Sequence, residues 1–282
     1  MKVRSPAYAG TFYEGNATSL KAQIEGCFRH ELGPKALPKA SQGKLRNIVG
    51  MVSPHAGYMY SGPVAAHGYH HLALDGKPET VVIFGPNHTG RGSGLAIMKE
   101  GVWRTPLGEV ELDTAVGDSI IKESAVIDVD DTAHTQEHSI EVQLPWLQYL
   151  YGSGFKFVPI CFLMQDLESS REVGMAVAKA LRGKAGLVIA STDMTHYEPQ
   201  KIAEQKDKTV LEAAMKLDEK GLYSAVEGFQ VTMCGYGPTI AAITAAKELG
   251  AREGKLLCYK TSGDVIGDRS AVVGYASLVF TR

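Results

Sequence analysis

Three short apolar runs, each broken by proline or polar residues and then followed by a histidine, constrain the fold of this chain more than any other feature. The runs and their histidines are residues 47–53 with His55, residues 80–84 with His88, and residues 187–190 with His196. Apolar runs of this length are typical of strands that are buried on both faces of a parallel sheet. Pro54 ends the first run because proline has no backbone donor for the hydrogen-bond ladder. The sequence therefore predicts three buried strands, each with a histidine just beyond its end.

Helical segments alternate with these runs along the chain. Residues 17–32 place apolar side chains on one face, residues 167–181 are amphipathic, and residues 236–249 are rich in alanine. This alternation predicts a single α/β domain over residues 1–282, with a largely parallel or mixed central sheet and helices on both faces. Ligands in open α/β sheets bind beyond the carboxyl ends of the strands. If the three strands are parallel neighbours, their histidines should converge at that edge.

The composition is that of an ordinary globular protein and narrows the classes of partner. Hydrophobic residues make up 44% of the 282 residues, charged residues make up 21%, and the net charge is −2. This charge balance gives no reason to expect binding to nucleic acid or to an anionic membrane. The chain has no apolar stretch long enough to span a bilayer and no signal-peptide core near its N-terminus. We therefore expect a cytoplasmic protein.

Two strand-end histidines with a nearby acid suggest a metal site. His55 and His88 would supply two imidazoles, and Asp193, just after the third run, could supply a carboxylate. Two histidines and one carboxylate are a ligand set of non-haem iron(II) sites, so iron(II) is the first expectation for the metal. Cys234 could instead supply a thiolate, which suits iron, copper or zinc. His196 would then be free to act as an acid or base near neutral pH.

The four cysteines lie far apart and form no CxxC pair, which argues against a structural zinc cage and against a disulfide framework. Cys234 differs from the others because it lies in the glycine-rich segment TMCGYGP, ahead of the alanine-rich helix. A metal-free alternative is a nucleophilic pair formed by Cys234 and a histidine. We rank this alternative lower because it leaves two strand-end histidines without a role.

A further polar cluster surrounds His138 in the segment DDTAHTQEHSIE. Residues 135–138 predict a helix start, and Glu137 and Glu141 flank the histidine, with Glu141 one helical turn further on. The cluster is either a solvated surface group or a pocket histidine that is oriented by an acid. The sequence leaves these two interpretations open.

The segments SPHAGYMYSG, FGPNH, EHSIEVQLPWL, STDMTHY and MCGYGP occur in this chain. Together they resemble the successive motifs of the Memo family, which in archaea and bacteria is also called AmmeMemoRadiSam system protein B. The resemblance covers nearly the whole chain. It implies a fold similar to that of the class III extradiol dioxygenases, which are non-haem iron(II) enzymes. It also implies that His55, His88 and Cys234 are metal ligands and that Asp193 and His196 are polar groups of the same pocket.

The resemblance is compatible with two classes of function. The first is a metal-dependent redox or oxygenase-type enzyme that acts on an unknown small molecule, with iron(II), copper or zinc as cofactor and His196, Asp193 and His138 as catalytic residues. The second is a non-catalytic binding or adaptor module that holds a peptide or metabolite in the same pocket. A cysteine stands where the dioxygenases have a glutamate ligand, so ring-cleaving activity does not follow from the fold. The family name also implies a pathway link to AMMECR-like and radical-SAM proteins.

Overall fold

A computed structural model describes residues 2–41 and 43–282 of the chain. Within these residues, nine strands form one sheet in the order β10-β12-β2-β9-β3-β8-β4-β7, with β11 paired to β12 outside this path. The strands are β2 (Ile48–Ser53), β3 (Thr80–Pro86), β4 (Leu95–Ile97), β7 (Asp128–Val129), β8 (Lys156–Phe162), β9 (Gly186–Ser191), β10 (His196–Glu198), β11 (Glu253–Thr261) and β12 (Val272–Thr281).

The centre of the sheet is parallel and its margins are antiparallel. Strands β2, β9, β3 and β8 run parallel, with Val188 of β9 opposite Gly50 on one side and opposite Val82 on the other. Strand β12 is antiparallel to β2, and β4 is antiparallel to β8. Every residue of β2, β3 and β9 is buried, as strands covered on both faces require. The prediction of an α/β fold with a mixed central sheet is confirmed.

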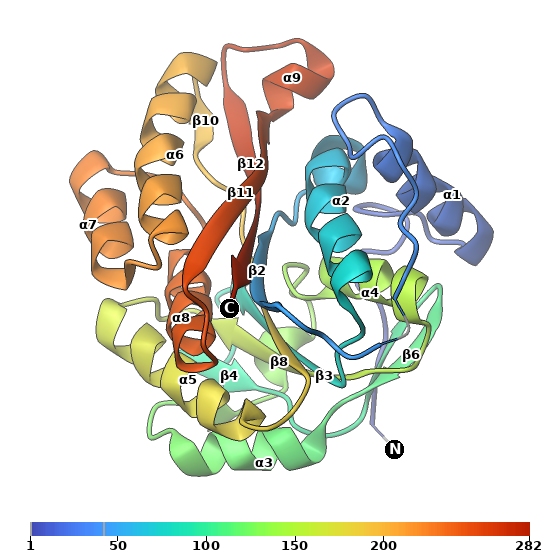
Figure 1. The fold of residues 1–282 in the computed structure, drawn as a ribbon, viewed down its shortest axis with the longest axis vertical. Helices are drawn as coiled ribbons and strands as arrows, with labels where there is room; N and C mark the ends of the chain where they lie inside the picture. The colour runs from blue at the N-terminus through green and yellow to red at the C-terminus, as the bar shows by residue number, and fades with distance from the viewer. Residues whose placement is uncertain (1, 42) are drawn as a thin grey trace.

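Helices cover both faces of this sheet (Figure 1). Helices α1, α2 and α4 lie on one face, α5 to α8 lie on the other, and α3 packs against α5. Their bounds are α1 (Ala17–Arg29), α2 (Tyr58–Asp75), α3 (Thr114–Glu123), α4 (Leu144–Tyr151), α5 (Leu167–Leu181), α6 (Gln200–Met215), α7 (Glu219–Phe229), α8 (Tyr236–Glu248) and α9 (Ser262–Ile266).

Alternate side chains of each central strand enter the two hydrophobic cores. Met51, Ile83 and Ile189 belong to the core that contains residues of α1, α2 and α4. Their neighbours Val52 and Val82 belong to the core that contains α5 and α8. This alternation follows from the period of two in a strand, and it explains why the central runs are apolar at every position.

A second, three-stranded sheet ties the N-terminal segment to the main body. It contains β1 (Val3–Arg4), β5 (Val102–Thr105) and β6 (Gly108–Glu111). The Arg4 guanidinium is buried and lies 4.2 Å from the centre of the Trp103 ring, a cation–π contact. The residues after β1 are thereby directed toward the loop that carries His138.

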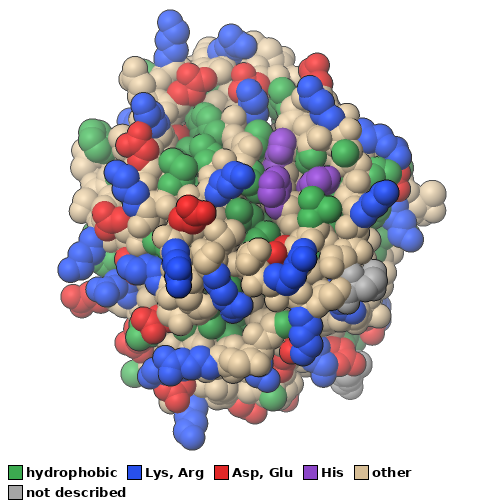
Figure 2. All heavy atoms as spheres, viewed as in Figure 1, with side chains coloured by type: hydrophobic (Ala, Val, Ile, Leu, Met, Phe, Trp, Pro, Cys, Tyr) green, Lys and Arg blue, Asp and Glu red, His purple; other side chains and the backbone are tan. Residues whose placement is uncertain are grey.

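The surface seen in Figure 2 carries lysine, arginine and acidic side chains that are interspersed, which fits the small net charge of the chain. Histidine side chains also gather on this face beside α2, the helix that carries His67, His70 and His71. No helix among the described residues is both long and apolar enough to cross a membrane.

Candidate metal centre

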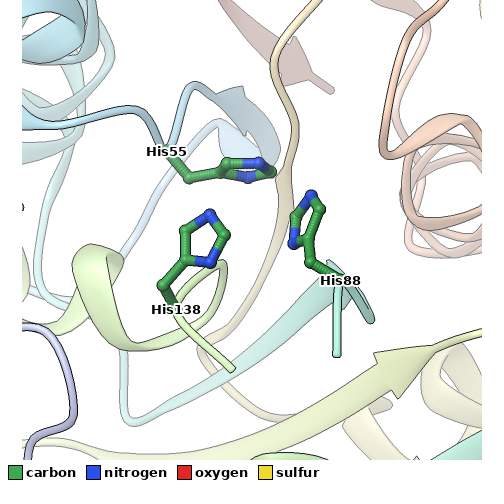
Figure 3. Close-up of side chains that lie close together, drawn as sticks. All are labelled: His55, His88 and His138. Atoms are coloured by element: carbon green, nitrogen blue, oxygen red, sulfur yellow. The ribbon is translucent and has the colours of Figure 1, made fainter. Parts of the chain in front are cut away.

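Three histidines meet at the carboxyl end of the central parallel strands. His55 follows β2 after Pro54, His88 lies just beyond β3, and His138 lies on the loop between the 3-10 turns Thr132–His134 and Glu141–Gln143. Each offers one ring nitrogen, and these three atoms lie within 4.8 Å of one another. Figure 3 shows the three rings facing a common point. The described residues contain no other such group of three or more histidine, cysteine or acidic side chains.

Sequence reasoning identified His55 and His88 as ligands, offered Cys234 or Asp193 as the third ligand, and placed His138 among the catalytic residues. The expected convergence of His196 with His55 and His88 is not seen: β9 ends at Ser191, the chain then pairs with β12 at His196, and His196 is not a member of the group of three. His138 takes the third place from a loop far away in sequence. The α4 helix begins at Leu144, later than the helix start predicted at residues 135–138. The sequence signals for His138 were its acidic neighbourhood and its place in the segment EHSIEVQLPWL.

Neighbouring hydroxyl and carbonyl groups set the tautomer of His55. Its Nδ1 lies 3.0 Å from Ser191 Oγ, which donates its own proton to Ser139 O at 2.5 Å. The hydroxyl therefore accepts from Nδ1–H, and it also accepts from Gln143 Nε2 at 2.7 Å. Nε2 is left with a free lone pair. Burial, followed by the nearby His88, places the pKa of His55 well below its usual value, so the ring is neutral.

The Glu137 carboxylate orients the other two histidines. It is 1% exposed and accepts hydrogen bonds from His88 Nδ1 at 2.9 Å and from the backbone amides of His88 and His138 at 2.6 and 2.9 Å. Burial alone would raise the pKa of Glu137, but the hydrogen bond and charges of His88 and His138 lower it to about 2. Because the carboxylate holds the proton of Nδ1, His88 Nε2 is free to bind a metal.

The His138 ring is packed between other rings. It stacks on His88 with 4.5 Å between ring centres and lies 4.6 Å from the Phe12 ring, and its Nδ1 is 3.3 Å from Glu137 Oε1. Burial and then His55 lower the pKa of His138 to about 3. The His138 ring is therefore neutral, largely covered and fixed in orientation, as a ligand histidine requires.

Cys234 and Asp193 lie next to Nε2 of His55, the ring nitrogen that is left free for a metal. Cys234 Sγ is 3.2 Å from His55 Nε2, and Asp193 Oδ2 is 3.9 Å from the same atom. Asp193 Oδ1 accepts the backbone amide of His55 at 2.8 Å. Gly235 permits this approach, because a Cβ at that position would lie 2.7 Å from Ser191 O. Neither Cys234 nor Asp193 belongs to the group within 4.8 Å, so the assignment of either as a ligand stays a prediction.

Burial sets the protonation of these two groups. Burial and then the Asp193 charge raise the pKa of Cys234 well above its usual value, so the thiol is protonated unless a cation is beside it. Burial also raises the pKa of Asp193, against the opposing effect of the His55 amide. His196 Nδ1 donates to Thr232 O at 2.9 Å, which leaves its Nε2 free for proton transfer. The predicted acid–base role of Asp193 and His196 remains a prediction.

The N-terminal segment forms one wall of the site. The buried Glu141 carboxylate pairs with Arg4 and accepts the backbone amide of Tyr8 and the hydroxyl of Tyr13, at 2.9 and 2.7 Å. These bonds hold the Tyr8 ring 5.1 Å from the His138 ring, next to Phe12. Sequence reasoning identified Glu141 as a possible partner of His138, but its carboxylate anchors the N-terminal segment instead.

The comparisons with known proteins agree with this architecture. Residues 4–279 match the family model described as Memo-like protein. The chain belongs to the Memo-like family. It is 55% identical to a MEMO1 family protein of Methanopyrus kandleri over 99% of both chains. It is 52% identical to one of Methanothermobacter thermautotrophicus, which covers 98% of this chain and 99% of the relative.

A solved structure supports the fold alone. An uncharacterized protein from Escherichia coli K12 superposes with a TM-score of 0.55 and 13% sequence identity, covering 82% of this chain and 99% of that chain. This Memo-like protein therefore shares its α/β architecture with a structure whose sequence has diverged widely. The resemblance predicted from the five sequence segments is confirmed by the family match.

Proposed function

We propose that this Memo-like protein binds one transition-metal ion through His55, His88 and His138 and uses it in a redox reaction on a small molecule. The observation that carries the proposal is the convergence of three imidazole nitrogens, within 4.8 Å of one another, at the edge of the sheet. For His55 and His88, the second ring nitrogen is already committed to Ser191 or Glu137. Such outer partners fix the tautomer and direct the free lone pair toward a metal.

The choice of metal follows from the donors. Three imidazoles suit zinc, copper, iron and nickel, and a thiolate from Cys234 beside His55 would favour iron, copper or zinc. We expect iron(II), with copper or zinc as the alternatives. A bound iron ion would supply electron transfer and Lewis acidity at this point. His196 would move protons through its free Nε2, since its Nδ1 is bound to Thr232.

Metal analysis of protein purified without chelator and without oxygen tests the binding step. His55→Ala, His88→Ala and His138→Ala should each lose most of the bound metal, whereas His67→Ala should retain it because His67 lies on α2 away from the group. If the three site variants keep the metal content of the wild type under chelator challenge, the proposed site is wrong.

Oxygen consumption with a panel of small molecules then separates the two classes of function. Turnover that disappears in His196→Gln, while metal content is unchanged, supports the enzyme. Tight metal binding with no turnover on any compound favours the binding or adaptor module.

A further inference from the structure

The segment 137–143, which carries the third histidine of the centre, also contacts the chain beside His88. We call it the clamp segment. Ser139 is fully buried, and its Oγ donates to Pro86 O at 2.8 Å, two residues before His88. Gly85 permits this close approach, because a Cβ at that position would lie 2.5 Å from Ser139 Oγ. The end of β3, from which His88 follows, is therefore fixed against the clamp segment.

The clamp segment also contacts the chain on both sides of His55. Gln143 Nε2 donates to Pro54 O at 3.0 Å, one residue before the histidine. Val142 O accepts from the hydroxyl of Tyr58 at 2.6 Å, three residues after the histidine. Both bonds are buried, so water does not compete for either carbonyl. The loop between β2 and α2 is therefore held at both of its ends.

The neighbours of the buried Gln143 amide decide which way it points. Pro54 O can only accept a hydrogen bond, so the group that faces it must be the NH₂. The second proton of this NH₂ goes to Ser191 Oγ at 2.7 Å. The amide oxygen then faces the Tyr69 hydroxyl, which donates to it at 2.6 Å. The amide cannot turn over without placing its oxygen against Pro54 O, so its orientation is fixed.

Ser191 connects this amide to the His55 ring. The Ser191 hydroxyl donates to Ser139 O at 2.5 Å and accepts from Gln143 Nε2, which leaves one lone pair for Nδ1–H of His55 at 3.0 Å. Two of the three groups around this hydroxyl therefore belong to the clamp segment. The place of Ser191 Oγ, and with it the direction of the free lone pair of His55, depends on the clamp segment.

We propose that Ser139 and Gln143 are positioning residues that hold His88 and His55 at a fixed separation, so that the centre is formed before the metal binds. They act through the histidines and are not ligands themselves. Both belong to the segment that carries His138, so one segment sets the places of all three rings (Figure 3). A preformed centre binds more tightly, because no loop has to be ordered on binding. The inference rests on the proposed function, since it concerns the same metal.

Cobalt(II) is the probe, because the position and intensity of its visible absorption depend on the number and geometry of its ligands. Metal-free protein is titrated with cobalt(II), and the spectrum is recorded at saturation. Gln143→Leu and Ser139→Ala should each weaken cobalt binding about 10- to 100-fold and change the visible band of the saturated protein. Ser139→Ala removes a single hydroxyl, so it keeps the test decisive where Gln143→Leu does not fold. His138→Ala should lose the band, which assigns the band to this centre.

Gln148→Leu is the matched control for Gln143→Leu. The Gln148 amide is also buried, accepts from a hydroxyl, that of Thr105 at 2.5 Å, and donates to a carbonyl, Gly108 O at 3.1 Å. Both partners lie in the small sheet of β5 and β6. This variant should lower the urea midpoint but leave the cobalt affinity and the band unchanged.

The spectrum separates positioning from a merely structural role. Saturated Gln143→Leu and Ser139→Ala proteins with wild-type affinity and a wild-type band, but a lower urea midpoint, would overturn the inference while the metal site stands. Wild-type protein that binds no cobalt, or His138→Ala protein that keeps the band, would instead overturn the proposed metal site.

Discussion

Replacement of Glu137 by glutamine tests whether its carboxylate positions the ligand histidines His88 and His138. Glu137 Oε1 accepts from His88 Nδ1 and from the amides of His138 and Ser139, and Oε2 accepts from the amide of His88. In Glu137→Gln, an NH₂ group replaces one of these oxygens at nearly the same volume. In the less costly orientation it replaces Oε2, so the buried amide of His88 then faces a donor.

The loss of stability expected in Glu137→Gln can be worked out from these four hydrogen bonds. A buried amide left without an acceptor costs about 1–3 kcal/mol, and the other three bonds lose the extra strength of a charged acceptor. We expect the free energy of unfolding of the metal-free protein to fall by about 3 kcal/mol. Affinity for metal should fall about 10- to 100-fold, because His88 is no longer held by an anion.

Urea unfolding of the metal-free protein and titration with zinc(II) against a competing chelator measure the two effects. Glu172→Gln is the matched control, because Glu172 also accepts a backbone amide, from Ala125 at 2.8 Å, but lies far from the histidines in the α3–α5 region. The stability gap between wild type and Glu137→Gln should narrow as the pH falls from 4.5 toward 2, where the wild-type carboxylate gains its proton. A Glu137→Gln variant with wild-type zinc affinity would refute the positioning role.

Three further predictions concern the N-terminal wall, a buried histidine and the thiol. Arg4→Met leaves the Glu141 carboxylate buried without its cation and should cost about 3–5 kcal/mol in urea unfolding; a loss below about 1 kcal/mol would contradict the anchoring role. Burial, followed by Arg4, lowers the pKa of His134 to about 4, so between pH 6.5 and 4 the unfolded chain binds a proton that the folded chain does not, and the free energy of unfolding falls by about 3 kcal/mol over this range. His134→Gln should show a flatter dependence of unfolding free energy on pH in this window, and an unchanged slope would count against it. Because the pKa of Cys234 is raised, its alkylation in metal-free protein should be slow at neutral pH and faster at alkaline pH, and it should stop once metal is restored, whereas Cys161, fully buried, should stay unreactive in both states; equal labelling of Cys234 with and without metal at alkaline pH would argue against a thiolate ligand.

The sequence by itself determined the α/β class, the buried central strands and the placement of His55 and His88 beyond two of their ends. These features depend on local patterns, because a run that is apolar at every position can be buried only inside a covered sheet. A proline or glycine after such a run then places the next side chain at the sheet edge. The local pattern held for β2, β3 and β9, where every residue is buried.

Only the tertiary structure decided which third histidine joins the group and which acid serves it. The bond between His88 and Glu137 joins residues 49 positions apart, and the bond between His55 and Ser191 joins residues 136 positions apart. No periodicity in the sequence encodes such pairs, since they depend on strand order and on how closely loops approach. Glu141 is an example. Its spacing in the sequence suggested a contact with His138, but in the fold its carboxylate pairs with Arg4, because a buried guanidinium needs a buried anion.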